Sequence, residues 1–506
     1  MSINDNNCKN KGESYGRTMK YLGLFGSAQG ASMLFGIVRN KLTVKLIGAQ
    51  GLSVIAYFNR TVQMFSDCTN FSLSFSAVKR MSEAYETGDA ECIERLVKVV
   101  RSIAMLTGFV GMLLMLFLSP LVSDVVFNRE GVYTERMMLL SPVVLFMAVS
   151  GGELAILRGV KQLQRVAAYT FLMSVVSLFV SVPLYYLLGF SGVFISIFLI
   201  ALSQMTILLS FSLPLYAYKA KPFSFKILKE GLEMVKLGAG YMYATMFSSL
   251  AVWLVCAILS GFGENTTVGF FTACFTIIYL LPSVLFAALD SEYFPRLSGV
   301  VANAELRDAT VNQQLEIQQL VQSPLLMAFA VALPMVVPLF YDREFSAVVP
   351  MTQLAMFGMF MRSMAYPISF LPLSFGDTRA FVFQETIYNI CMVLFVTLGY
   401  LLMGLLGIGL GLAAVYTIDL LVVYFVARYR YAYRVSYNAM LCFILQMPLF
   451  VLSVAMMLFL KNGIIYWIAG GACVTLSSCI SLYMLHKHLN FSVLHIKRFI
   501  VKKIRK

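Results

Sequence analysis

Long apolar segments alternate with short polar connections along almost the whole chain. Each segment reaches or exceeds the roughly 20 residues that a helix needs to cross the hydrocarbon core of a membrane. This pattern predicts about fourteen membrane-spanning helices. The predicted spans fall near residues 20–47, 52–79, 99–123, 136–157, 166–188, 191–217, 233–261, 267–290, 314–341, 347–372, 379–403, 406–428, 436–460 and 464–485.

The connections between these segments are of two alternating kinds. Glycine-containing turns at 48–51, 189 and 404–405 are short and poor in cations, whereas 79–101 and 219–236 are longer and basic. Most of the 39 Lys and Arg residues therefore fall on the side that holds both termini. Because basic residues favour the cytoplasmic side, both termini are predicted to be cytoplasmic.

The two halves of the chain share one layout. Residues 46–80 and 259–296 each contain a glycine turn, an apolar segment with aromatic residues and a basic exit. Parallel repeats of this kind are typical of transporters, with the substrate site between them near mid-membrane. We therefore predict an all-α integral membrane protein with two parallel six-helix lobes around a central cavity, plus two C-terminal helices. The predicted parts are an N-terminal lobe (1–218), a cytoplasmic linker (219–232), a C-terminal lobe (233–430), two further helices (431–486) and a basic cytoplasmic tail (487–506).

Composition agrees with a membrane protein, since 59% of the residues are hydrophobic and only 13% are charged. The net charge of +14 would suggest nucleic acid in a soluble protein. Here the cations flank apolar segments, so they explain orientation instead, and no nucleic-acid partner is expected. The amphipathic tail is expected to bind anionic lipids.

Four cations lie inside predicted spans, three of them in the first two. Arg39 and Lys41 lie in the first span and Arg60 in the second. Arg39 and Arg60 lie about 8 Å beyond the midplane, on the side of the connecting turn. An isolated cation at such a depth costs about 3 kcal/mol or more. One interpretation is a basic patch that binds phosphate, which suits the forked guanidinium group. The alternative is pairing with a buried carboxylate such as Asp67.

The second half offers one further cation, and four acids lie in or at the ends of predicted spans along the chain. Arg362 lies near the middle of a span and could contact the same anion, or it could pair with Asp419 or Glu385. These two acids could also bind a coupling proton or sodium ion. Glu153 and Asp290 lie near cytoplasmic ends and are expected in solvent.

Signals for an enzyme are weak. All three histidines lie in the tail, at 486, 488 and 495, and no outer loop is long enough for a catalytic domain. The nine cysteines contain no CxxC pair, which argues against a zinc site or a disulfide framework. No metal site and no cofactor are predicted.

Two motifs resemble a known family. Residues 35–51 (Phe-Gly-Ile-Val-Arg-Asn-Lys-Leu-Thr-Val-Lys-Leu-Ile-Gly-Ala-Gln-Gly) are similar to the end of the first helix in oligosaccharide-lipid flippases of the Wzx type. The stretch 293–298 (Tyr-Phe-Pro-Arg-Leu-Ser) looks like an element common after the eighth span of these proteins. They belong to the multidrug/oligosaccharidyl-lipid/polysaccharide (MOP) exporter superfamily.

This resemblance implies a flippase for undecaprenyl-diphosphate-linked oligosaccharide in a bacterial inner membrane, and it makes Arg39 a cavity residue. Our hypothesis is that the diphosphate docks on Arg39, Arg60, Lys41 and Arg362 while the two lobes rock. A lipid II flippase and a cation-coupled drug antiporter of the same fold remain alternatives. A membrane-embedded polymerase or acyltransferase would need a large outer loop or a buried histidine.

Overall fold

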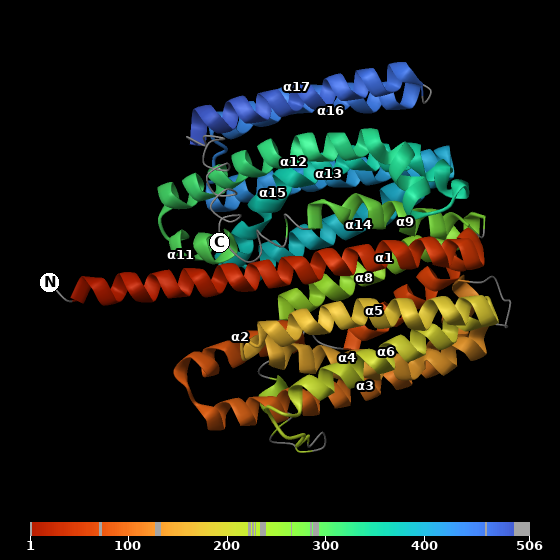
Figure 1. Cartoon of the computed structure of the whole chain (residues 1–506), viewed down its shortest axis with the longest axis vertical. Coiled ribbons are helices and arrows are strands. Elements are labelled where there is room, and N and C mark those ends of the chain that lie inside the picture. The colour runs from red at the N-terminus through yellow and green to blue at the C-terminus, as the bar shows by residue number, and fades with distance from the viewer. Residues whose placement is uncertain are drawn as a thin grey trace, which may run out of the picture. The chain divides into compact units, whose positions relative to one another are not determined.

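The computed structural model of the chain is built almost entirely from α-helices (Figure 1). It describes residues 3–489, except 70–72, 127–132, 221–223, 225–226, 228, 233–238, 265, 284–285, 287–292 and 461–462. Within these residues, 11 helices are long and apolar enough to cross a membrane. Each of them coincides with a predicted span. The predicted all-α membrane fold is therefore confirmed, while the total of about fourteen spans stays a prediction.

The chain divides into two compact units, Met1–Gly269 with Phe340–Asp342 and Phe270–Leu339 with Arg343–Lys506. The helices up to the division are α1 (Ile3–Thr69), α2 (Leu73–Thr87), α3 (Ala90–Val126), α4 (Thr134–Gly159), α5 (Leu163–Leu188), α6 (Ser191–Ser212) and α8 (Ala239–Phe262). Those that follow are α9 (Thr267–Leu280), α11 (Phe294–Val300), α12 (Ala304–Phe340), α13 (Val348–Ser374), α14 (Thr378–Met403), α15 (Leu405–Tyr431), α16 (Tyr437–Phe459) and α17 (Ile464–Leu489). The lobe boundaries inferred from the repeat stay a prediction.

Helix α1 consists of two arms that meet at Gly48. The backbone there has φ 67° and ψ −174°, a conformation that is open almost only to glycine. The arm after the break runs antiparallel to the segment 249–269, since contacts later in the arm meet earlier residues of that segment. Near its start, Ser53 Oγ accepts a hydrogen bond from the Gly269 amide at 2.7 Å, and two turns later Trp253 Nε1 donates to Thr61 Oγ1 at 3.0 Å. The predicted glycine turn is confirmed.

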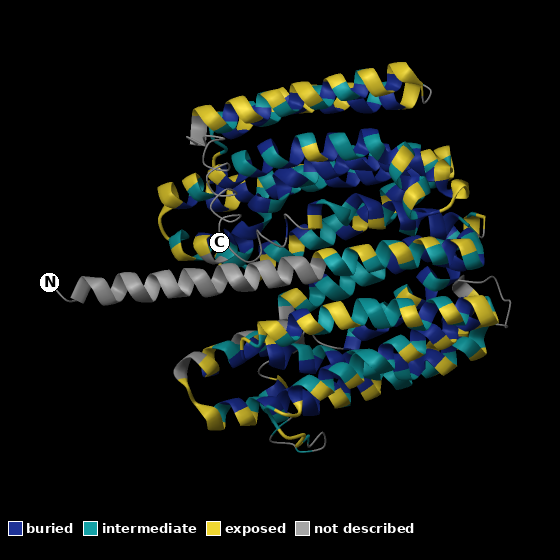
Figure 2. Ribbon diagram, in the orientation of Figure 1, coloured by how far each residue is buried: buried dark blue, intermediate teal, exposed yellow. Residues whose placement is uncertain are grey.

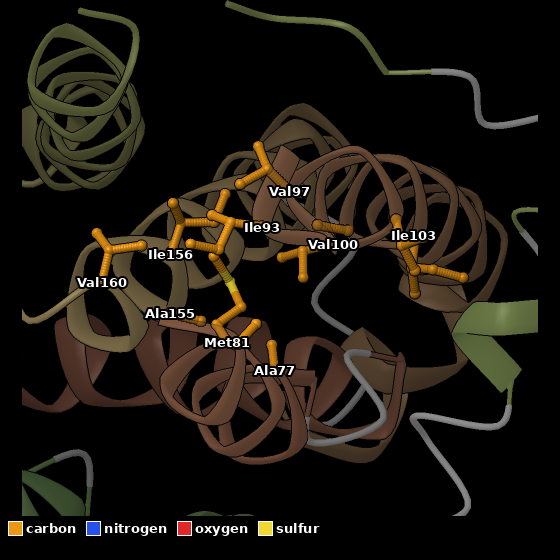
Figure 3. Packing of buried hydrophobic residues seen from close by; sticks show 12 residues of the cluster. Ala77, Met81, Ile93, Val97, Val100, Ile103, Ala155, Ile156 and Val160 are labelled. Atoms are coloured by element: carbon orange, nitrogen blue, oxygen red, sulfur yellow. The ribbon is translucent and has the colours of Figure 1, made fainter. Parts of the chain in front are cut away.

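A core of apolar side chains lies where α2, α3 and α4 meet. Met81 of α2 points into this cluster, between Ile93 of α3 and Ile156 of α4 (Figure 3). Leu215 and Ile227, which lie on either side of the start of the predicted linker, also pack against it. The first part of the linker region is thus held to the first unit by burial of apolar surface.

The hairpin of α14 and α15 in the second unit depends on glycine. Gly404 joins the two helices with φ 61°, so the connection predicted at this position is confirmed. Further in, a Cβ placed on Gly407 would lie only 1.8 Å from the carbonyl oxygen of Gly399. The two helices therefore touch through their backbones, which brings the polar side chains of α15 close to α14.

The C-terminal helices α16 and α17 are joined to the rest of the second unit by polar contacts. Tyr466 donates its hydroxyl proton to the Val331 carbonyl of α12 at 2.9 Å and accepts from Gln353 Nε2 of α13 at 3.0 Å. All three residues lie in helices long enough to span a membrane. The opposite faces of α16 and α17 expose mostly apolar residues, as a lipid-facing surface requires (Figure 2).

Candidate functional site

Arg362 lies near the middle of α13, in a helix long and apolar enough to span a membrane. Its Nη1 lies 3.5 Å from Asp419 Oδ2 of α15, and the two side chains are only 20% and 13% exposed. This distance exceeds the roughly 2.7–2.9 Å typical of a charge-assisted hydrogen bond. Among the described residues, the Nε of Arg362 is buried and has no hydrogen-bond partner. The guanidinium group therefore keeps unused donor capacity.

Tyrosine rings surround this guanidinium group. Its central carbon lies 5.1 Å from the ring centre of Tyr388, 5.2 Å from that of Tyr416 and 5.9 Å from that of Tyr366. The hydroxyl groups of Tyr279 and Tyr416 lie 2.9 Å apart, so α9 contributes to the same cluster. Cation–π contacts replace part of the lost hydration of a buried cation without neutralising its charge. The positive charge stays available to an anion.

Two carboxylates belong to this cluster. Glu385 of α14 interacts electrostatically with both Arg362 and Asp419. Glu385, Tyr388 and Asn389 follow one another at helical spacing, which places them on one face of α14. The ion pair predicted between Arg362 and Asp419 is present. The structure thus brings together Arg362, Asp419 and Glu385, three of the second-half residues that sequence singled out, as one cation beside two acids.

The cations of the first helical hairpin have different neighbours. Arg39 is partly buried in the first arm of α1 and lies within electrostatic range of Tyr185 of α5. Lys41 is exposed. Arg60 is partly buried in the second arm and lies within electrostatic range of Cys256 of α8. Each arm thus presents its arginine to a different helix, and a joint role for the three cations stays a prediction.

Asp67 was the carboxylate suggested as a partner for these cations. Its side chain instead accepts hydrogen bonds from Gln63 Nε2, at 2.9 Å to each oxygen, and from the hydroxyl of Ser249. Gln63 lies one turn earlier on the same arm of α1, and Ser249 lies on α8. Asp67 is therefore held by neutral groups.

The expectation of a solvated Glu153 was wrong. Glu153 of α4 forms a two-pronged ion pair with Arg101 of α3, with Nε–Oε1 and Nη2–Oε2 distances of 2.7 and 3.0 Å. Both side chains are 1% exposed. Arg101 also donates to the carbonyls of Tyr216 and Ala217, at 3.0 and 2.8 Å, and to Ser212 Oγ. This pair ties α3 and α4 to the segment after α6.

Sequence reasoning assigned Arg101 to a basic loop and Glu153 to a helix end. The available signal was that Arg101 is the last charge before the apolar stretch of its helix and that Glu153 is the one acid of the following helix close to the same membrane side. Two other expectations lie outside the described residues: Asp290, and residues 490–506 of the basic tail.

Comparison with known families adds to this geometry. A family model described as polysaccharide biosynthesis protein matches residues 89–350, which is more than half of the 506 residues. The chain belongs to the polysaccharide biosynthesis protein family. No curated protein matches its sequence.

The fold of this polysaccharide biosynthesis protein is similar to those of solved membrane transporters. The lipid II flippase MurJ, in an inward closed conformation, gives a TM-score of 0.70 at 16% identity, covering 92% of this chain and 100% of that one. An inward-facing multidrug resistance MATE family transporter of the MOP superfamily gives 0.66 at 15%, covering 79% and 94%. A MOP superfamily transporter from Pyrococcus furiosus gives 0.57 at 14%, covering 81% and 94%.

These likenesses establish the MOP-superfamily fold, as the resemblance to Wzx-type flippases implied. The family match covers the Arg101–Glu153 pair. Arg362 and its carboxylates follow the matched region, whereas Arg39, Lys41 and Arg60 precede it.

Proposed function

We propose that the protein is a flippase that moves undecaprenyl-diphosphate-linked oligosaccharide repeat units across the inner membrane of a bacterium. Membership of the polysaccharide biosynthesis protein family supports a glycan as part of the substrate. The MOP fold supports transport, since the solved structures similar to this chain include a lipid II flippase. The lipid-linked glycan serves O-antigen, capsule or exopolysaccharide synthesis. It crosses by alternating access, and the protein supplies no covalent chemistry.

The unused hydrogen-bond donors of the Arg362 guanidinium group are the observation that most supports an anionic substrate. A guanidinium group in a membrane-spanning helix is costly unless it is paired or functional. The contact between Arg362 and Asp419 is long, and Nε of Arg362 has no partner among the described residues. A diphosphate oxygen can accept two donors of the guanidinium fork and replace the weak contact with Asp419. Asp419 and Glu385 then balance Arg362 when no substrate is bound.

Arg39, Arg60 and Lys41 are proposed to meet the diphosphate along the first helical hairpin. Their partly buried or exposed side chains are compatible with contact to an anion at the membrane depth inferred from sequence. A proton or sodium ion is proposed to drive the cycle. Both termini are proposed to be cytoplasmic, with anionic lipids bound at the C-terminal tail.

The test is flipping of a fluorescent polyprenyl-diphosphate glycan in proteoliposomes. Arg362→Ala is expected to reduce the flipping rate at least tenfold, because the loss of a charge-assisted contact is worth about 1.5–3 kcal/mol. Arg362→Lys keeps the positive charge but not the forked guanidinium group, so its flipping rate is expected to lie between those of wild type and Arg362→Ala. Arg428→Ala, which removes an exposed cation near the end of α15, is the control and should leave the rate unchanged.

Wild-type flipping in all of Arg362→Ala, Arg39→Ala and Arg60→Ala would remove the proposed phosphate site. Loss of flipping in Arg39→Ala or Arg60→Ala, with wild-type flipping in Arg362→Ala, would mean that the diphosphate is bound by the first helical hairpin.

A lipid II flippase is the second candidate, supported by the likeness in fold to MurJ over 92% of this chain. Both substrates carry a polyprenyl diphosphate, so the arginine variants do not separate them. Competition does. Excess unlabelled lipid II should leave the flipping of a labelled oligosaccharide-linked substrate nearly unchanged if the main proposal holds, and should abolish it if lipid II is the true substrate.

A further inference from the structure

Asp67 is a carboxylate in the predicted interior of the membrane that has no ion-pair partner among the residues that the structure describes. The residue lies at the middle of the predicted span 52–79, in the second arm of α1. Its side chain is partly buried and is held by Gln63 and Ser249. An ionised carboxylate with only neutral partners is expensive at this depth. The same group is inexpensive when it carries a proton.

Both partners of Asp67 can form a hydrogen bond with its side chain whether that side chain is ionised or protonated. A serine hydroxyl donates to a carboxylate and can accept from a carboxyl group by rotating. The Gln63 amide presents its NH₂ to both carboxylate oxygens at 2.9 Å, and after a flip it presents its carbonyl oxygen to a carboxyl proton. Arginine has no acceptor, so the ion pairs of Glu153 and Asp419 cannot adapt in this way.

The charged and titratable groups around Asp67 come from few elements. On α1, Cys68 is adjacent, and Arg60 lies about 10 Å away along the helix axis, beyond ion-pair distance. On α8, Ser249, Trp253 and, further along, Cys256 form hydrogen bonds with this arm. Towards α3, Thr69, two residues further along α1, lies against Gly111, which in turn faces Val144 of α4. None of these groups is a cation within ion-pair distance of Asp67, so binding a proton is the way in which its negative charge can be neutralised.

We propose that Asp67 is a proton-binding site that couples proton movement to transport. The carboxylate takes a proton from water on one side of the membrane, becomes a neutral carboxyl group, and later releases the same proton to water on the other side. Coupling to transport rests on the proposed function; proton binding does not.

A proton fits this site better than a metal cation. Hard cations are bound by several oxygen ligands, and both Asp67 oxygens already accept a donor from Gln63. Within the part of the chain that the structure describes, no group of three or more His, Cys, Asp or Glu side chains could hold a metal ion.

Proton binding is tested by infrared difference spectroscopy of the purified protein in nanodiscs during a pH titration. The carbonyl stretch of a protonated carboxyl group should appear in wild type as pH falls, and that component should be lost in Asp67→Asn. Asp67→Glu should restore a titrating component at a shifted frequency. Asp124→Asn, which removes an exposed carboxylate near the end of α3, should leave the Asp67 component in place. Identical difference spectra for wild type and Asp67→Asn would overturn the proposal.

Coupling is tested in proteoliposomes with an imposed proton gradient and, separately, a sodium gradient. Wild-type flipping should respond to the proton gradient, whereas Asp67→Asn should flip at one rate with or without it. A response to sodium alone, or an unchanged proton response in Asp67→Asn, would refute coupling through Asp67. If the substrate class is wrong, wild type will not flip the glycan at all, yet the infrared band will still titrate. The two proposals therefore fail separately.

Discussion

Removal of the Glu153 carboxylate should destabilise the first unit strongly. In Glu153→Ala the buried guanidinium group of Arg101 loses two charge-assisted hydrogen bonds and keeps only neutral acceptors, namely Ser212 and the carbonyls of Tyr216 and Ala217. Breaking a buried ion pair from one side typically costs about 3–5 kcal/mol, because an uncompensated charge stays behind. Both side chains are 1% exposed, so bulk solvent does not reach the pair.

The double variant Arg101→Met/Glu153→Leu separates the cost of the lone charge from the value of the pair. Replacing both partners by apolar residues of similar size leaves no buried charge, so most of the lost stability should return. The three acceptors that Arg101 leaves behind make full recovery unexpected.

The assay is thermal unfolding of the purified protein in detergent, followed by intrinsic fluorescence and by the fraction that stays monodisperse after heating. The control is Arg95→Met, which breaks the exposed pair between Arg95 and Glu230 and should leave the midpoint unchanged. The reasoning is refuted if Glu153→Ala unfolds at the control's temperature, or if the double variant is no more stable than the single one.

Two further predictions concern the second unit. Gly407→Ala should lower the free energy of unfolding by about 1–3 kcal/mol, because its Cβ would lie 1.8 Å from the Gly399 carbonyl oxygen and force α14 and α15 apart. The control is Gly471→Ala on α17, where a Cβ meets nothing within 4 Å. Equal thermal midpoints for the two variants would contradict the close contact. Burial acts to raise the pKa of Asp377, but hydrogen bonds from Arg430, the Ala380 amide and Tyr431 outweigh it and hold that pKa below its usual value. Because the folded-state pKa is lowered, this stabilisation is present at neutral pH and is lost as pH falls through the folded-state pKa. The stability difference between wild type and Asp377→Asn should therefore shrink on acidification; a difference independent of pH would exclude ionised Asp377 as its source.

The helices were predictable because a membrane leaves the backbone few choices. Every span must satisfy its own hydrogen bonds, so apolar length alone located all 11 spanning helices that the structure describes. Glycine marked the breaks at 48 and 404 for a local reason, since few other residues adopt the required φ. These features depend on residues close together in the sequence.

The side-chain partners were harder to predict because they depend on packing between distant segments. The charges of Arg362 and Asp419 could be paired from sequence, since few charges lie in the second-half spans. The tyrosines around Arg362 could not, because Tyr279 and Tyr416 come from α9 and α15 and look like ordinary apolar residues in a hydrophobic pattern. Glu153 was misplaced for a related reason: its helix end is covered by the segment after α6, which no periodicity reveals.

The bonds of Tyr466 have a consequence for biogenesis. The Val331 carbonyl and the Gln353 amide remain without this partner until the final hairpin of the chain has been synthesised and inserted. Gln353 also donates to the Ala330 carbonyl of α12 at 3.3 Å, and Gln319 of α12 donates to Ser363 of α13 at 2.9 Å, so these two helices can associate before that hairpin arrives. Tyr466 then adds the last polar contact between them. A nascent chain truncated before α16 lacks this contact and the two helices that cover it, and should be a preferred substrate for membrane quality-control proteases.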